Sequence, residues 1–323
     1  MNRTKTIAVA ATAIAAVTGA TLAVVPAFAH SKAPADGPTA HGSAAARSAT
    51  GGRGDLFVAS LNGANEVPVQ GGPAVGDRDG AALEFVKVDG DRISVAVKWR
   101  GTGRPTALHI HQGDKGANGG IKVDFTKLLG KGEHRSVTGT VKVGDKALLE
   151  AFRAGPDGFY ANLHTAEFPG GAVRGQFHKV TSSFAFGRAL HNFQAPVVKG
   201  RQIYECRKGE NGTYSFQQRD VRAVLAGNIA HSFVAPNSGT PQWAAKDGSA
   251  VTGKVITRTP NGERNIPELD LKATPSGEKH GLFADTVEIL RLNTVGGAAP
   301  SGSCQEGSIV GVPYGADYVF VQR

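Results

Sequence analysis

The chain has 323 residues and a formal net charge of +9, with 36 Lys and Arg against 27 Asp and Glu. The basic residues are spread along the chain, and neither zinc-finger spacing nor a glycine-rich phosphate loop occurs. Both facts argue against nucleic-acid binding. The charge favours loose attraction to anionic cell-wall polymers or polysaccharides, but it does not specify a partner.

The N-terminus has the pattern of a signal peptide. Arg3 and Lys5 precede an apolar run at 7–25, and the sequence PAFA at 26–29 places small residues at the A-x-A positions. We expect cleavage after Ala29; an uncleaved anchor is the alternative, because the run is long for a signal core. Cleavage lowers the net charge from +9 to +7, because two cations leave with no acid. No later segment is apolar for long enough to span a bilayer. The sequence predicts a secreted, soluble protein.

Residues 30–52 are rich in Ala, Ser, Gly and Pro without hydrophobic periodicity, which predicts a flexible tether. A first domain is predicted at 53–180, because short alternating segments there are separated by turn signals. The predicted strands are Leu56–Leu61, Ala82–Val88, Arg92–Trp99, Ala107–His111, Ser136–Val143, Phe159–His164 and Val173–His178. Asp89-Gly90 predicts a hairpin turn, and Asp145 is the expected N-cap of one short helix that ends at Gly155.

Polar side chains alternate along three of these strands. His109 and His111 are two residues apart, so a strand projects both onto one face. If the three strands share a sheet, one polar surface contains these two histidines and the following four side chains. They are Asn162, His164, Arg174 and Gln176. This surface is the predicted functional site.

A packed connector is predicted at 181–195, because it carries three phenylalanines, and a second β-rich domain at 196–323. Its predicted strands are Arg201–Cys206, Thr213–Phe216, Val251–Thr257, Leu269–Ala273, Thr286–Leu292 and Tyr318–Val321. The chain has two cysteines, Cys206 and Cys304, and export favours one structural disulfide between them. Closing so long a loop stabilises the domain by roughly 2–4 kcal/mol.

The first domain resembles the CHRD domain, the module named after chordin that also occurs in secreted bacterial proteins. The resemblance rests on LNGANEVP at 61–68, LHIHQG at 108–113, Asn118-Gly119 and NLHTAEFPGGAVRGQF at 162–177. It implies an immunoglobulin-like or superoxide-dismutase-like β-sandwich, and therefore an all-β protein. It also implies extracellular protein interaction, without an established enzymatic activity.

The second domain resembles a secreted domain of unknown function found in bacteria and fungi. The matching segments are GRQIYEC at 200–206, GNIAH at 227–231, PQW at 241–243, KDGS at 246–249, LRLNTVGG at 290–297 and PYGADY at 313–318. Glu268 stands where the resemblance leads us to expect a Trp. The resemblance implies a domain and supplies no activity.

Three interpretations of the histidines remain open. Two imidazoles on one face can chelate zinc or copper, with His164 as a third ligand and Glu66 or His178 completing the set. The second interpretation is a hydrogen-bonded structural network of neutral histidines. The third is a contact surface for a ligand. Arg174 argues partly against a metal, because a cation beside a divalent ion costs energy.

The function predicted from the sequence is non-catalytic binding in the extracellular space or cell envelope. The partner would be an extracellular protein, a polysaccharide or a cell-wall polymer. A small metalloenzyme, possibly redox-active, and a purely structural envelope protein are the alternatives. Dismutase activity is disfavoured, because only His134 lies between His111 and His164, where a zinc loop would need more ligands. A triad of His231, Asp247 and Ser249 lacks the G-x-S-x-G elbow. The sequence does not specify the oligomeric state.

Overall fold

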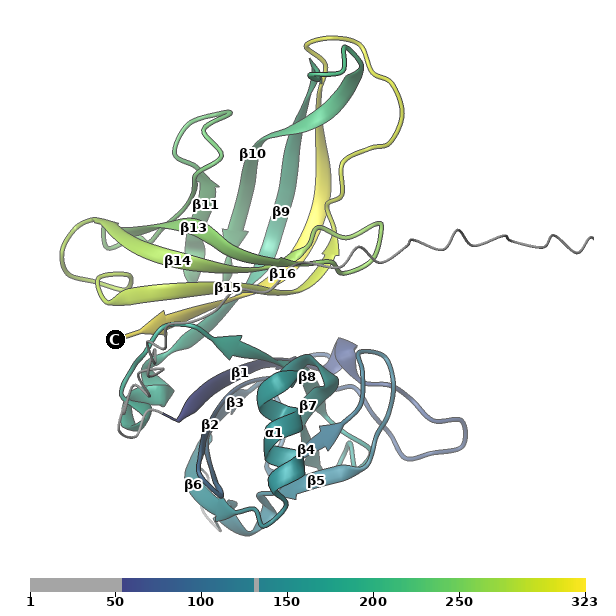
Figure 1. Cartoon of the computed structure of the whole chain (residues 1–323), viewed down its shortest axis with the longest axis vertical. Helices are drawn as coiled ribbons and strands as arrows, with labels where there is room; N and C mark the ends of the chain where they lie inside the picture. Colours follow the sequence, from purple (N-terminus) through teal and green to yellow (C-terminus); the bar gives the residue numbers. More distant parts are fainter. Residues whose placement is uncertain (1–53, 131–133) are drawn as a thin grey trace, which may run out of the picture. The chain divides into compact units, whose positions relative to one another are not determined.

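A computed structural model of the chain describes residues 54–130 and 134–323. The predicted signal peptide and tether lie outside these residues. The described residues fall in one compact unit, which contains two β-rich modules (Figure 1). We call residues 55–180 the first module and residues 193–322 the barrel module. None of the described helices is long and apolar enough to cross a membrane.

The first module is one curved antiparallel sheet in the order β5-β4-β7-β8-β1-β2-β3-β6. Its strands are β1 Asp55–Asn62, β2 Ala81–Asp89, β3 Arg92–Arg100, β4 Pro105–Gln112, β5 Ile121–Asp124, β6 Ser136–Lys142, β7 Phe159–Thr165 and β8 Val173–Val180. Strand β1 pairs with β2 on one side and with β8 on the other. The eight strands therefore form a continuous sheet, where a sandwich would have two separate ones.

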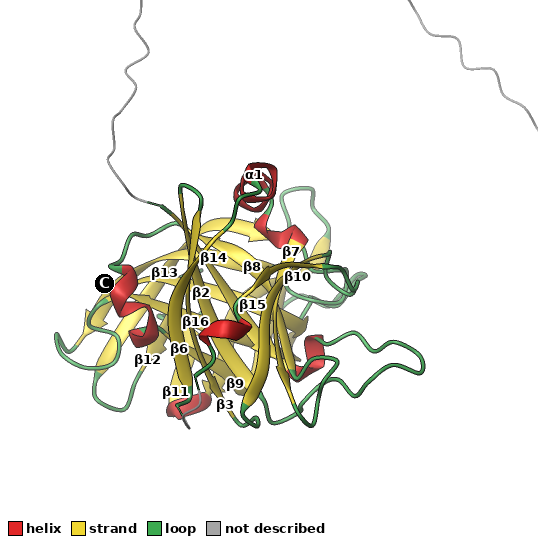
Figure 2. Cartoon of the chain, turned by 90° about the horizontal axis from the view of Figure 1, so that it is seen from below, coloured by secondary structure: helices red, strands yellow, loops and turns green. Residues whose placement is uncertain are grey.

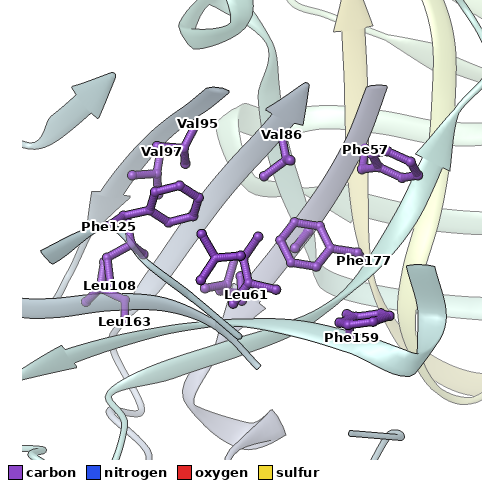
Figure 3. Close-up of a cluster of buried hydrophobic side chains, with 14 of the residues drawn as sticks. Phe57, Leu61, Val86, Val95, Val97, Leu108, Phe125, Phe159, Leu163 and Phe177 are labelled. Atoms are coloured by element: carbon purple, nitrogen blue, oxygen red, sulfur yellow. The ribbon is translucent and has the colours of Figure 1, made fainter. Parts of the chain in front are cut away.

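The concave side of this sheet encloses the apolar core of the first module. Alternate residues of β1, Phe57 and Leu61, point into it together with Phe125, Phe159 and Phe177 (Figure 3). Every one of these five side chains is buried. The period-2 pattern of the strands thus produces the core that the sequence predicts.

Local signals in the first module act as predicted. The hairpin between β2 and β3 turns at Gly90, which has a φ of 58°, a conformation that suits glycine. The helix α1, Lys146–Ala154, has Asp145 as its N-cap, whose side chain accepts a hydrogen bond from the Leu148 amide at 3.0 Å. Leu149 and Phe152 on this helix pack into the core.

The second β-rich unit is a closed barrel of eight strands, seen among the yellow strands of Figure 2. Its strands are β9 Phe193–Lys208, β10 Tyr214–Leu225, β11 Ile229–Phe233, β12 Pro241–Ala244, β13 Ser249–Thr259, β14 Glu268–Gly277, β15 Thr286–Gly296 and β16 Ile309–Gln322. Pairing of β16 with β9 closes the barrel. The predicted disulfide is confirmed: Cys206 and Cys304 are bonded, with Cα atoms 5.8 Å apart.

An apolar cluster separate from the core of the first module joins the convex side of β1–β3 to the barrel module. Val58 and Phe85 pack there against Leu290 and Val319. Both faces of β1–β3 are therefore buried, which explains why β2 is buried at almost every position. The connector that precedes β9 contributes a 3-10 helix, η4 Phe186–His191, to this contact.

The short 3-10 helices complete the description. They are η1 Gly63–Asn65, η2 Thr126–Leu128, η3 Pro156–Gly158 and η5 Ala226–Asn228, in addition to η4. The prediction of an all-β chain with two modules is confirmed. Strands β5, β11 and β12 were not predicted, and β9 begins at Phe193, three residues before the expected start of the second domain.

Candidate functional site

The predicted polar surface is the convex side of β4, β7 and β8. In the antiparallel register His109 lies opposite Asn162, and Asn162 lies opposite Arg174. His111 is paired with Tyr160. The residues between the histidines, Leu108 and Ile110, point into the apolar core instead. The strand alternation therefore brings all six predicted side chains onto one face of the sheet.

Three of them, His109, His111 and His164, form a cluster. One ring nitrogen from each lies within 4.8 Å of one from each of the others. The ring centres are 5.5 Å apart for His109 and His111 and 5.1 Å apart for His109 and His164. Nδ1 of His109 is 3.3 Å from Nε2 of His164. A shared mononuclear site fails if these nitrogens are more than about 6 Å apart, and the observed geometry satisfies this condition.

The second nitrogen of each ring contacts an oxygen atom at the edge of the cluster. Nδ1 of His111 is 2.9 Å from the Gly119 carbonyl oxygen, and Nδ1 of His164 is 3.0 Å from that of Pro169. A carbonyl only accepts, so both rings carry their proton on Nδ1 and a lone pair on Nε2. Nε2 of His111 is buried and has no hydrogen-bond partner among the described residues.

His109 is oriented the other way round. Its Nε2 lies 3.5 Å from an Asp124 carboxylate oxygen and 3.3 Å from Oγ1 of Thr126. These partners favour the proton on Nε2 and leave the lone pair on Nδ1, which faces His164. In this tautomer one lone pair of each ring faces the centre of the cluster; in the other tautomer of His109, its Nδ1 donates a hydrogen bond to Nε2 of His164. An acceptor in the outer shell of each imidazole is also what fixes metal-ligating histidines in proteins.

The three imidazoles are held in their neutral form. Burial and, to a smaller extent, the neighbouring His164 lower the pKa of His109 to about 4, against the opposing effect of Asp124. Burial also lowers the pKa of His111 and of His164. Neutral imidazole is the form that binds a metal ion.

The Arg174 side chain is hydrogen-bonded to the loop at 113–119. Its guanidinium donates to the carbonyl oxygens of Asp114 and Ala117, at 3.1 and 2.7 Å, and to the side chain of Asn118 at 3.1 Å. It also lies 3.4 Å above the Tyr160 ring, which stacks on His111. Only 1% of Arg174 is exposed. The charge thus fixes the loop that carries the Gly119 carbonyl.

The other predicted ligands lie outside the cluster. Glu66 accepts a hydrogen bond from Asn162 at 3.4 Å, and burial raises the pKa of this carboxyl to about 7 despite the nearby Arg174. His178 lies 3.6 Å from Glu268. Gln176 donates to the carbonyl oxygen of Gly113, at 3.0 Å, and so supports the same loop. Within residues 54–130 and 134–323 the ligating group consists of the three histidines.

Asp124, Thr126, Tyr160 and Gly119 were missed at the sequence level. Asp124 lies opposite His109 on β5, a strand of four residues whose short pattern, Ile-Lys-Val-Asp, gives little signal. Carbonyl partners such as Gly119 carry no sequence signal at all, because every residue has a carbonyl group. Tyr160 was on a predicted strand, but its stacking on His111 depends on the register.

The triad considered in the barrel module does not form. Ser249 donates to Asp247 at 2.6 Å within a turn. Both nitrogens of His231 are occupied, by the carbonyl oxygen of Gln242 at 2.8 Å and by the Tyr318 hydroxyl at 3.1 Å. Trp243 is 1% exposed and stacks on His231. Its ring is therefore part of the barrel interior.

Glu268, the residue that departs from the expected Trp, is also buried. It accepts a hydrogen bond from the Asn293 amide at 2.9 Å and another from Lys115 at 3.1 Å. Lys115 belongs to the same loop at 113–119 that Arg174 fixes. The Glu268 carboxylate thus joins this loop to the barrel module.

The fold and the site define a two-module all-β protein whose polar site lies in the first module. Residues 57–177 match the CHRD domain, and residues 226–322 match a protein family of unknown function, DUF3455. Each match falls within one module. No curated protein and no solved structure shows significant similarity to the chain. The CHRD domain and the disulfide support an extracellular role of the binding type.

Proposed function

We propose that the chain is an exported binding protein whose first module holds one divalent transition-metal ion, zinc or copper. The ligands are Nδ1 of His109, Nε2 of His111 and Nε2 of His164. The observation that supports the proposal is the convergence of three neutral ring nitrogens whose opposite nitrogens contact oxygen atoms. Imidazole nitrogen suits both metals.

The distances are compatible with an ion after a small adjustment. A tetrahedral ion with bonds of about 2.0–2.1 Å holds its ligand atoms about 3.3 Å apart. Nδ1 of His109 and Nε2 of His164 are already 3.3 Å apart. Without an ion, one of these nitrogens can carry a proton and donate to the other. A bound cation would replace this hydrogen bond with two metal–nitrogen bonds. His111 then has to approach through side-chain rotation.

The positive charge of Arg174 should weaken metal binding less than the sequence suggests. Its guanidinium donates four hydrogen bonds to the loop at 113–119 and to Gln176. The charge is therefore partly compensated by oxygen atoms on the side that faces the loop. The same loop supplies the carbonyl group that orients His111.

Elemental analysis of the mature chain, purified without chelators, tests the proposal. We expect about one equivalent of zinc or copper in the unmutated protein and less than a tenth of this in a His109→Ala/His111→Ala variant. His280→Ala is the matched control, because His280 is exposed in the barrel module, and it should retain the metal. Circular dichroism checks that all three proteins are folded.

Calorimetric titration of chelator-treated protein with zinc and with copper covers the case of metal lost during purification. The proposal is wrong if neither ion binds the unmutated chain, or if the double variant binds as much as the control. Three histidines leave a position open on a tetrahedral ion, and this favours a metalloenzyme as the second candidate function. A redox assay of the copper-loaded protein separates the enzyme from the binder.

A further inference from the structure

A pocket of ≈ 500 Å³ lies on the convex side of the first module, at the ends of β2 and β3 and away from the histidines. Its apolar lining includes Leu83 of β2, Leu190 of η4 and Phe193 of β9. Leu83 is buried and the other two are half-buried. The volume is in the range of small-molecule sites, and the lining suits an apolar body.

Three cations line the same pocket: Lys98, Arg100 and Arg135. No Asp or Glu is among the lining residues. In the part of the chain that the structure describes, none of the three has a carboxylate within 4.0 Å, whereas nine other basic side chains do. The pocket therefore combines an apolar lining with uncompensated positive charge.

Lys98 is held by its surroundings, whereas Arg100 is exposed. Nζ of Lys98 donates to the Leu190 carbonyl oxygen at 2.8 Å, and burial lowers the pKa of this ammonium group. Arg100 partly offsets the burial that raises the pKa of Asp317, but Asp317 is engaged by Ser60, Asn62 and Asn293 and does not line the pocket. An anion in the pocket would stabilise both cations.

We infer that this pocket binds a small amphiphilic anion, a medium-chain carboxylate. The chain of such a molecule matches the apolar lining, and its headgroup matches the cations. Guanidinium groups pair with carboxylates through two parallel hydrogen bonds. Charge complementarity excludes cationic ligands and disfavours neutral ones of the same shape. The site shares no residue with the histidine cluster, so it is independent of the proposed metal.

Titration of the mature chain with octanoate and with octan-1-ol tests the inference. Calorimetry should show saturable binding of octanoate to one site and at least tenfold weaker binding of the alcohol. Burial of apolar surface can release little heat near 25 °C. Displacement of the fluorescent anion 8-anilinonaphthalene-1-sulfonate is therefore a second measurement. Decanoate should bind roughly tenfold more tightly than octanoate, because it buries two more methylenes.

Two variants and one control identify the site. An Arg100→Ser/Arg135→Ser variant should weaken octanoate binding at least tenfold and leave octan-1-ol binding within twofold. Arg135→Ser alone, at an exposed residue, covers the case in which the double variant does not fold. Arg92→Ser is the control, because Arg92 is an exposed cation at the opposite end of β3.

Three outcomes overturn the inference. The first is the absence of saturable octanoate binding by both methods. The second is equal affinity for octanoate and octan-1-ol, which would mean that the cations do not contribute. The third is equal weakening by Arg92→Ser, which would mean attraction to the net charge of the protein.

Discussion

The two modules use histidine in opposite ways. In the barrel module His231 lies inside, stacked on Trp243, and both of its nitrogens have partners. In the first module the three histidines lie on the convex face: one nitrogen of each ring contacts an oxygen atom at the edge of the cluster, and the other nitrogen faces the neighbouring histidines. Burial lowers the pKa in both places. The nitrogen that faces other histidines, rather than the burial, distinguishes a candidate ligand from a structural histidine.

The first core also contains a buried ionisable group, the carboxyl group of Glu84. Glu84 of β2 is fully buried, and neither carboxylate oxygen has a hydrogen-bond partner among the described residues. Burial raises the pKa of Glu84 to about 8, so it is neutral at pH 7. The first module thus buries a neutral acid and the barrel module a neutral base. The contributions of these two groups, Glu84 and His231, to the free energy of unfolding change with pH in opposite directions.

The largest expected effect comes from Glu84. The folded chain retains its proton up to about pH 8, whereas the unfolded chain releases it near pH 4.5. The free energy of unfolding should therefore fall as pH rises through this window, by about 1.4 kcal/mol per unit for this group, and level off above it. In Glu84→Gln the slope should decrease by this amount, and the slope that remains comes from other acids whose pKa burial raises, such as Glu66 and Asp270. Denaturant unfolding between pH 4 and pH 9 measures it.

Glu150→Gln is the matched control for this experiment, because Glu150 is exposed on α1. It should retain the slope of the unmutated protein. An unchanged slope in Glu84→Gln would contradict the assignment of a neutral carboxyl group to this core.

A smaller effect separates the two kinds of histidine. His231→Ala leaves a cavity beside Trp243 and removes one of the two partners of the Tyr318 hydroxyl, so we expect a loss of about 3 kcal/mol in the free energy of unfolding. His111→Ala, measured with a chelator present, should cost less than about 1.5 kcal/mol, because one of its nitrogens has no partner to lose.

Thermal and denaturant unfolding of the two variants give this comparison. Equal losses would show that the cluster in the first module is as structural as His231, and the metal proposal would lose its main support. Zinc should raise the melting temperature of His231→Ala and leave that of His111→Ala unchanged.

The smallest effect concerns the outer shell of the cluster. Asp124→Asn removes the charge beside Nε2 of His109, and we expect about tenfold weaker zinc binding with little change in stability. Asp91→Asn is the control, because Asp91 pairs with Lys142 away from the histidines. Competition with a zinc indicator measures both affinities. A ratio near one would exclude Asp124 from the orientation of His109.

Much of the fold follows from local patterns in the sequence. Alternation predicted seven strands of the first module, and Asp145 and the Asp-Gly turn marked the helix start and the hairpin. The convergence of His109, His111 and His164 also follows from alternation once the strands are paired. Closure of the barrel does not, because pairing of β16 with β9 depends on residues about a hundred positions apart.

The buried state of Glu84 could not be predicted for a related reason. Glu84 alternates with Ala82 and Val86, which lie in the first core, but a carboxyl side chain usually marks an exposed position, so the sequence carries no signal of its burial. The carbonyl groups of Gly119 and Pro169 are equally invisible in the sequence, because loop geometry alone places them against the histidines.

The pairing of β1 with both β2 and β8 also determines when the sheet can be completed during synthesis of the chain. Residues 55–100 emerge from the ribosome before the rest of the sheet and can form the hairpin of β2 and β3 at once, but the partner of Leu56 on the other side is Val180. The sheet cannot be completed until that strand has been synthesised. A chain with such distant pairing folds slowly. One edge of β1 therefore stays unprotected in the nascent protein until more than a hundred further residues have followed it.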